Sequence, residues 1–270
     1  MRDDLVEDPI EWGRQLIKTE DHDPLYSGLC RWGADMRGSR VRRFLLTYWC
    51  CYSVGAAWFI SKQSGSRYWD LLEQAAANVR GPSEFGYGFD RWPRAHERRH
   101  WRGQKCVDSV LWLRGAFRHP EEAVISLEMC RTLADVEAVA QRWPLFGPWI
   151  SFKIADMLER VLGVPVAFPD AITSLYKDPR EGADLMAPYL GLDNPQEVTE
   201  RLLGEYGYTD APGTDKRHRP CNVQEVETVL CKWKSARKGH YWLGCDTSSH
   251  RKELSEWGAT DLLNVYPNGK

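Results

Sequence analysis

The chain has 270 residues, of which 43% are hydrophobic and 27% are charged, and its formal net charge is −2 at pH 7. This composition is ordinary for a folded globular protein and argues against a disordered chain. No stretch approaches the roughly 18 consecutive apolar residues of a membrane helix, and the acidic start MRDDLVEDP lacks an apolar signal region, so we expect a cytoplasmic protein without membrane contact.

Helical periodicity dominates the chain, no convincing strand run appears, and we therefore expect an all-α fold. In the first half, the expected helices cover 7–20, 40–63 as one long buried helix, 66–79 with Ser66 as N-cap, 105–117, 121–133 and 134–143. In the second half they cover 148–162, 171–178, 195–208, 222–239 capped by Asn222, and a short stretch at 252–257. Residues 207–220 are rich in turn residues and are expected to form a polar linker.

The stretch from Trp143 to Asp170 is the most informative one. Pro148 suits the first turn of a helix, and the apolar residues that follow it, from Ile150 to Leu162, recur at three- and four-residue spacings. Lys153 lies off that apolar face. The free amides at the start of this helix suit a phosphate group, and Asp170 follows at the entrance to the next expected helix.

This stretch resembles the helix-hairpin-helix core of the base-excision DNA glycosylases, whose pattern is roughly L-P-G-V-G-x-K-T-A followed by V-P-V-D. Lys153 lies at the lysine of that pattern and Asp170 at the catalytic acid. Trp149 and Ser151 replace both hairpin glycines, and extra residues precede the aspartate. The resemblance implies one helix-hairpin-helix domain over 1–270, with one lobe from 1–135 and 215–270 and another from 136–210.

A closer resemblance, over most of the chain, is to the alpha-glutamyl/putrescinyl thymine pyrophosphorylases of phages, also called amino acid:DNA transferases. It is carried by Glu97–Lys105 (ERRHWRGQK), Glu227–Ser235 (ETVLCKWKS) and Gly239-His240-Tyr241. It implies an enzyme that replaces the pyrophosphate of 5-(pyrophosphoryloxymethyl)uracil in DNA with an amino acid or a polyamine, in the host cytoplasm if a phage encodes it. DNA with modified thymine and a free amine donor would be the partners.

Two basic segments indicate contacts with DNA. The run RWPRAHERRHWRGQK, residues 91–105, interleaves cations with two tryptophans, as a nucleic-acid groove requires. The alternative is a solvated helix face with its tryptophans in the core. Because the chain has a second basic run at 232–238, we interpret both basic segments as binding phosphate groups. The expected substrate and DNA contacts are Arg94, Arg98, Arg99, His100, Arg102, Gln104, Lys232, Lys234, His240 and Tyr241.

Three residues are expected to be catalytic, and each has a plainer alternative. Asp170 would steady positive charge or take a proton from the incoming amine, or it is only a helix N-cap. Lys153 would bind the DNA backbone or the pyrophosphate, or it is an ordinary exposed helix lysine. Glu227 would hold the donor amine, or it pairs with a basic neighbour.

Eight cysteines without a CxxC pair, and without four closely spaced members after Asp170, argue against a metal site or an iron–sulfur cluster. We therefore expect no metal and no resident cofactor, although magnesium would be compatible with bound pyrophosphate. Two other functions stay open at this point: a base-excision glycosylase that uses Asp170 with Lys153 as nucleophile, and a non-catalytic DNA-binding module.

Overall fold

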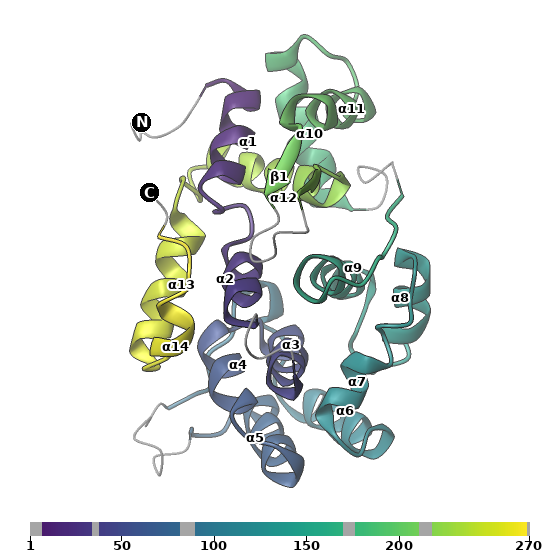
Figure 1. The fold of residues 1–270 in the computed structure, drawn as a ribbon, viewed down its shortest axis with the longest axis vertical. Helices are drawn as coiled ribbons and strands as arrows, with labels where there is room; N and C mark the ends of the chain where they lie inside the picture. Colours follow the sequence, from purple (N-terminus) through teal and green to yellow (C-terminus); the bar gives the residue numbers. More distant parts are fainter. Residues whose placement is uncertain (1–6, 34–37, 82–89, 170–175, 211–217, 269–270) are drawn as a thin grey trace. The chain divides into compact units, whose positions relative to one another are not determined.

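The computed structural model describes residues 7–33, 38–81, 90–169, 176–210 and 218–268. Its regular structure is almost entirely helical, which confirms the predicted all-α class (Figure 1). Strands β1 (Tyr208–Asp210) and β2 (His218–Pro220) pair antiparallel, with Tyr208 opposite Pro220. The two ends of the expected linker are therefore paired with each other, which the sequence did not indicate.

The chain folds as two compact units. Unit 1 comprises Met1–Arg31, Phe168–Arg251 and Val265–Lys270, and unit 2 comprises Trp32–Ala167 and Lys252–Asn264. This grouping differs from the lobes expected from the sequence, because residues 136–167 belong with the helices that precede them. The assignment of the whole chain to one helix-hairpin-helix domain stays a prediction.

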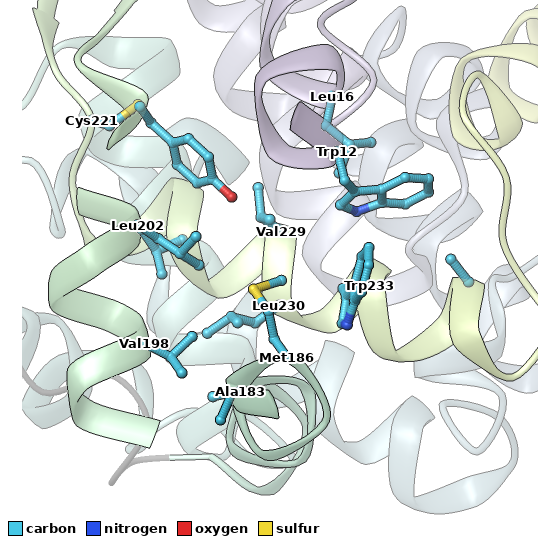
Figure 2. Packing of buried hydrophobic residues seen from close by; sticks show 14 of the residues in the cluster. Trp12, Leu16, Ala183, Met186, Val198, Leu202, Cys221, Val229, Leu230 and Trp233 are labelled. Atoms are coloured by element: carbon cyan, nitrogen blue, oxygen red, sulfur yellow. The ribbon is translucent and has the colours of Figure 1, made fainter. Parts of the chain in front are cut away.

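Unit 1 has its core among four helices, which are α1 (Pro9–Lys18), α10 (Lys177–Leu190), α11 (Pro195–Tyr206) and α12 (Val223–Arg237). It also contains most of α2 (Pro24–Gly33) and the start of α13 (Cys245–Glu256). Figure 2 shows Trp12 of α1 facing Trp233 of α12, and their ring centroids are 5.9 Å apart in an edge-to-face arrangement. Val198 and Met186 bring α11 and α10 into the same buried cluster.

Helices α10 and α12 lie unusually close together because of a glycine. A Cβ atom added to Gly182 of α10 would lie 2.2 Å from the carbonyl oxygen of Leu230 of α12. Any side chain at this position would force the two helices apart, and the core of unit 1 would lose its packing at that crossing.

Several boundaries in unit 1 differ from those expected. The expected helix 171–178 lies mostly outside the described residues, and α10 begins at Lys177 with Pro179 inside its first turn, where a missing N–H costs little. Helix α2 was not predicted, and α13 is longer than 252–257. The helices expected at 7–20, 195–208 and 222–239 are confirmed, the last with a capping box between Asn222 and Glu225.

Unit 2 consists mainly of seven α-helices among its described residues, with α14 (Thr260–Leu263) added from the C-terminal segment. The seven are α3 (Ser39–Cys51), α4 (Val54–Ser61), α5 (Gly65–Ala77), α6 (Gln104–Ala116), α7 (Pro120–Ile125), α8 (Leu133–Ala140) and α9 (Pro148–Met157). A short 3-10 turn, η2 (His96–Arg98), precedes α6. Fully buried Trp49 and Trp69 anchor the core of this unit.

The expected long helix over 40–63 is two helices. Tyr52 takes a left-handed conformation (φ 55°) and ends α3, and the Ser53 hydroxyl then accepts a hydrogen bond from the Ala56 amide to cap α4. Helix α5 likewise begins after Ser64 instead of Ser66. Hydrophobic periodicity continued through these boundaries, so it could not reveal the break.

Helix α9 confirms the local interpretation of its sequence. Pro148 is its first residue, with Gly147 at the N-cap, and a π-helical turn, η3 (Leu158–Leu162), extends it to Gly163, whose φ of 74° closes the helix. Helix α8 packs against α9, and the two helices and the turn that connects them form a helical hairpin within unit 2 (Figure 1).

Candidate functional site

Two arginines of the basic segment 91–105 point into unit 2. Arg94 donates to the Asn78 side chain at 2.6 Å and to the carbonyl of Ala75 at 3.3 Å. Arg98 is only 6% exposed and donates to the carbonyls of Cys50 at 3.1 Å and Leu145 at 3.2 Å. Burial lowers the pKa of both guanidiniums. Both arginines were predicted to contact DNA, but these hydrogen bonds join them to protein groups, which favours a structural role.

The other basic residues of the segment are exposed. These are Arg91, His96, Arg99, His100, Arg102 and Lys105. Trp92 and Trp101 are buried, at 2% and 1% exposure, so the rings expected to stack on an unpaired base lie in the core. Gln104, predicted as a contact, donates to Asp108 one turn further along α6 at 2.8 Å. The segment therefore presents cations without aromatic platforms, which suits phosphates better than bases.

Arg98→Ala and Arg99→Ala are expected to give opposite results. Arg98→Ala leaves two carbonyls without their donor, one of them a C-terminal carbonyl of α3, and should lower the free energy of unfolding by about 2–4 kcal/mol. Arg99→Ala should change stability by less than about 0.5 kcal/mol but lower the salt dependence of DNA binding by about one unit of slope. Urea unfolding and DNA titrations at several salt concentrations measure both. Equal effects of the two variants on stability would contradict this division.

The turn between α8 and α9 has an unusual residue at its tip. The Phe146 amide donates to the carbonyl of Trp143 at 3.1 Å, with Pro144 and Leu145 between them. Leu145 has φ of 69°, and proline holds φ of Pro144 near about −65°, so this is a type II turn, whose third position normally carries glycine. The left-handed conformation costs leucine on the order of 1–2 kcal/mol. Leu145 is 44% exposed, so this cost falls on a residue that lies partly in solvent.

Neighbouring elements hold this turn in place. Arg98 donates to the carbonyl of Leu145, and the Ser109 hydroxyl of α6 donates to the carbonyl of Pro144 at 2.6 Å. The basic segment and the hairpin turn are thus joined within unit 2. Leu145 could not be predicted from the sequence, because Trp-Pro-Leu-Phe contains no residue that favours positive φ at that position.

Lys153 lies in the middle of α9 and is 8% exposed, with Nζ 5.3 Å from the ring centroid of Phe152. The alternative of an ordinary exposed lysine does not fit this burial. Asp156 and Arg160, further along the same helical segment, are also buried, at 0% and 3% exposure, and their charged groups lie 3.9 Å apart. The α9 segment is therefore buried around its circumference from Ile150 to Met157, which overturns the expectation that Lys153 lies off its packed face.

Glu227 lies on α12 in unit 1 and is 3% exposed. Its carboxylate accepts a hydrogen bond from the Thr228 hydroxyl at 3.3 Å and a weak one from the Cys231 thiol at 3.4 Å. The same Thr228 oxygen lies 3.4 Å from a carboxylate oxygen of Asp23. Two acidic side chains therefore approach the Thr228 hydroxyl. Asp23 is thus a candidate functional residue that the sequence interpretation missed, although it ends the acidic run Glu20–Asp23.

Two predicted contacts of unit 1 belong to a buried network. Lys232 is 9% exposed and donates to the carbonyl of Asp21 and, at 3.0 Å, to the Tyr241 hydroxyl. Tyr241 in turn donates to the Asp21 carboxylate, and its burial raises its pKa. Lys232 also pairs with Asp246 at 2.7 Å. This network favours a structural role for Lys232 and Tyr241 over contact with DNA.

The remaining predicted residues of unit 1 differ in their surroundings. Lys234 pairs with Asp178 and, at 3.1 Å, with Glu181. Burial disfavours its charged form, but these acidic partners outweigh it and raise the pKa of Lys234. His240 is exposed in the loop after α12. The second basic run is thus largely neutralised by acids of its own unit.

Unit 2 therefore contains the exposed cations, the hairpin turn and Lys153, and unit 1 contains Glu227, Asp23 and His240. Asp170 lies outside the described residues, so its catalytic role stays a prediction. Among the residues described, no group of three or more His, Cys, Asp or Glu side chains is arranged to hold a metal ion. In the same part of the chain, every helix is too short or too polar to cross a lipid bilayer.

Comparisons with known proteins point to one family. The model of the amino acid:DNA transferase family matches residues 17–241, a span that includes the basic segment, the hairpin and α12. The chain is 35% identical over 274 positions to a glycinyltransferase of Pseudomonas phage PaMx11, which covers 92% of this chain and 90% of that protein. It is 25% identical over 270 positions to a putrescinyltransferase of Delftia phage PhiW-14, covering 95% and 82% respectively.

Proposed function

Because this chain belongs to the amino acid:DNA transferase family, an enzyme family that acts on DNA, we propose that it displaces pyrophosphate from 5-(pyrophosphoryloxymethyl)uracil in DNA with an amine. The family match over residues 17–241 is the observation that carries this proposal. Glycine is the proposed donor, because the named glycinyltransferase is more similar to this chain than the named putrescinyltransferase. A polyamine is the alternative donor. Both relatives are phage proteins, which supports action in the cytoplasm of a host cell.

The reaction is a substitution at the methylene carbon attached to the uracil ring. The lone pair of the amine nitrogen forms a bond to this carbon while the bond from carbon to the pyrophosphate oxygen breaks, and that oxygen keeps the electron pair. The nitrogen then carries a positive charge and loses a proton to a base. Catalysis therefore needs three things: cations that stabilise the departing pyrophosphate, a base for the amine proton, and a means of exposing the uracil.

Cations of unit 2 suit the first requirement. Exposed Arg99, His100 and Arg102 are proposed to bind the DNA backbone. Lys153 is proposed to act on the pyrophosphate, since an ammonium that is largely shielded from water interacts more strongly with an anion than an exposed one does. The strength of this attraction rises as the pyrophosphate comes closer to Nζ of Lys153.

Carboxylates suit the second requirement. Glu227 of α12 is proposed as the base that accepts the amine proton, because its carboxylate is buried and is oriented by the hydroxyl of Thr228. Asp170 is proposed, from its position in the glycosylase-like pattern, to steady the positive charge that develops at the methylene carbon. The structural partners found for Lys232 and Tyr241 leave these two without a proposed contact to the substrate.

The direct test uses duplex DNA with one 5-(pyrophosphoryloxymethyl)uracil, incubated with the protein and glycine. We expect release of pyrophosphate and a modified nucleoside whose mass equals that of the glycine adduct. DNA carrying 5-hydroxymethyluracil is the control and should not react, since hydroxide is a poor leaving group. If an adduct forms when putrescine is supplied and none forms with glycine, putrescine replaces glycine as the proposed donor. Release of a free base or formation of an abasic site would overturn the proposal in favour of a glycosylase. DNA binding without any reaction would favour the non-catalytic module.

Parallel reactions with magnesium and with EDTA test the expectation that the enzyme has no resident metal. Turnover that is unchanged in EDTA would support it. Loss of turnover in EDTA, with recovery when magnesium is added, would show that a metal ion accompanies the pyrophosphate.

A further inference from the structure

We propose that Leu145 is a wedge that enters the base stack of duplex DNA beside the modified nucleotide. This inference rests on the proposed function, because a uracil within the stack cannot present its methylene group to a protein side chain until it leaves the helix. A protein that extrudes a base needs a group to occupy or distort the space between neighbouring base pairs, and aliphatic side chains do this in many DNA-bending proteins.

The first support is the conformation of Leu145. It occupies the third position of a type II turn with φ of 69°, where glycine would be free of strain. A leucine in that conformation, 44% exposed, is unfavourable for the isolated fold both in its backbone and in its solvent contact. Strained residues of this kind cluster where function requires them, and here the side chain is what glycine would lack.

The second support is the rigidity of the turn. The residues on either side of the tip, Trp143 and Phe146, are each 2% exposed, and their ring centroids lie 5.2 Å apart. The carbonyls of the two central residues accept hydrogen bonds from Ser109 and Arg98. The backbone below Leu145 is therefore fixed on both sides, as a side chain that must separate stacked bases requires.

The third support is the position of the exposed cations. Arg98 contacts the carbonyl of Leu145, and the next two residues in the chain, Arg99 and His100, are exposed. Phosphate contacts from these two would fix the duplex to the same frame that holds Leu145. An apolar tip beside cations fits the apolar interior and anionic edge of a duplex, and we therefore assign DNA, and not another protein, as its partner.

The test compares Leu145→Gly and Leu145→Ala on two substrates of the same sequence, one double-stranded and one single-stranded. Both variants should lose at least ~30-fold in turnover on the duplex, because extrusion of the base there requires unstacking, and should keep most of the wild-type turnover on the single strand. Leu145→Gly should also raise the Tm by roughly 2 °C, since glycine removes the backbone strain, whereas Leu145→Ala should not. Leu111→Ala on α6, 46% exposed, is the matched control and should match wild type on both substrates.

A second measurement does not depend on turnover. The fluorescence of a 2-aminopurine placed beside the target position should increase when the wild-type protein binds the duplex, because the base loses its stacking. With either Leu145 variant the fluorescence should not increase. Equal losses on duplex and single strand, or unchanged brightening with the variants, would overturn the wedge and leave the proposed function intact. If the wild type releases no pyrophosphate from either substrate, the proposed function fails, and the fluorescence alone decides whether Leu145 is a wedge.

Discussion

Replacing Glu227 with glutamine is expected to lower kcat for amine transfer by about 10²–10⁴-fold, the usual contribution of a positioned base. Glutamine has nearly the same shape, and its one oxygen can still accept the hydrogen bond of Thr228, while its NH2 group takes the place of the oxygen that the Cys231 thiol reaches only weakly. Glutamine cannot take up the amine proton. Because the substitution keeps the packing around this buried position, the Tm and the affinity for DNA should remain close to those of the wild type. Pyrophosphate release under saturating glycine measures the effect.

Glu225→Gln is the matched control, since Glu225 is a second buried carboxylate on the same helix. Its carboxylate accepts a hydrogen bond from the Asn222 amide at 2.8 Å in the capping box, and glutamine serves this purpose equally well. Turnover of Glu225→Gln should therefore stay within about twofold of wild type. Equal losses in both variants would indicate damage to α12, and full activity of Glu227→Gln would assign the proton transfer to another group.

Replacing Asp21 with alanine is expected to lower the free energy of unfolding by about 3–5 kcal/mol, as for other buried charges whose partners are removed. Asp21 is fully buried, and its carboxylate accepts hydrogen bonds from the amides of Gly244 and Thr247, at 2.8 and 2.9 Å, and from the hydroxyls of Thr247 and Tyr241. These amides lie at the start of α13, where an anion is favourable. Urea unfolding of the intact chain measures the loss.

Asp246→Asn is the control for the ion pair with Lys232, whose ammonium contacts the backbone carbonyl of Asp21. The side chain of Asp246 pairs with Lys232 but is 41% exposed, so its substitution should cost no more than about 1 kcal/mol. A small effect for Asp21→Ala, similar to that of Asp246→Asn, would mean that water replaces the lost contacts and that the network does not organise unit 1. If Asp21→Ala lost DNA binding while its free energy of unfolding stayed unchanged, the expected role of Lys232 and Tyr241 in DNA binding would be restored.

The two basic runs show where interpretation of charge by sequence reaches its limit. Both contain several cations within a few residues, and both were expected to face phosphate. Arg99 and its exposed neighbours fit that expectation, whereas Arg98 faces carbonyls 47 and 48 residues away and Lys232 faces Asp21, 211 residues away. Composition records how many charges a segment has but not which of them find partners in distant segments.

The sequence by itself determined the features that depend on near neighbours. Helical period, proline at the start of α9 and glycine at its end, and the Asn222 cap all act over about four residues, so the all-α class and most helices could be derived from it. The motifs around Glu97, Glu227 and His240 also sufficed to identify the family. The tertiary structure decided the break at Tyr52, the division of the arginines and the strained tip at Leu145. Each of these depends on hydrogen bonds or packing between residues far apart in the chain, whose favourable energy overrides the local preference of the residue concerned.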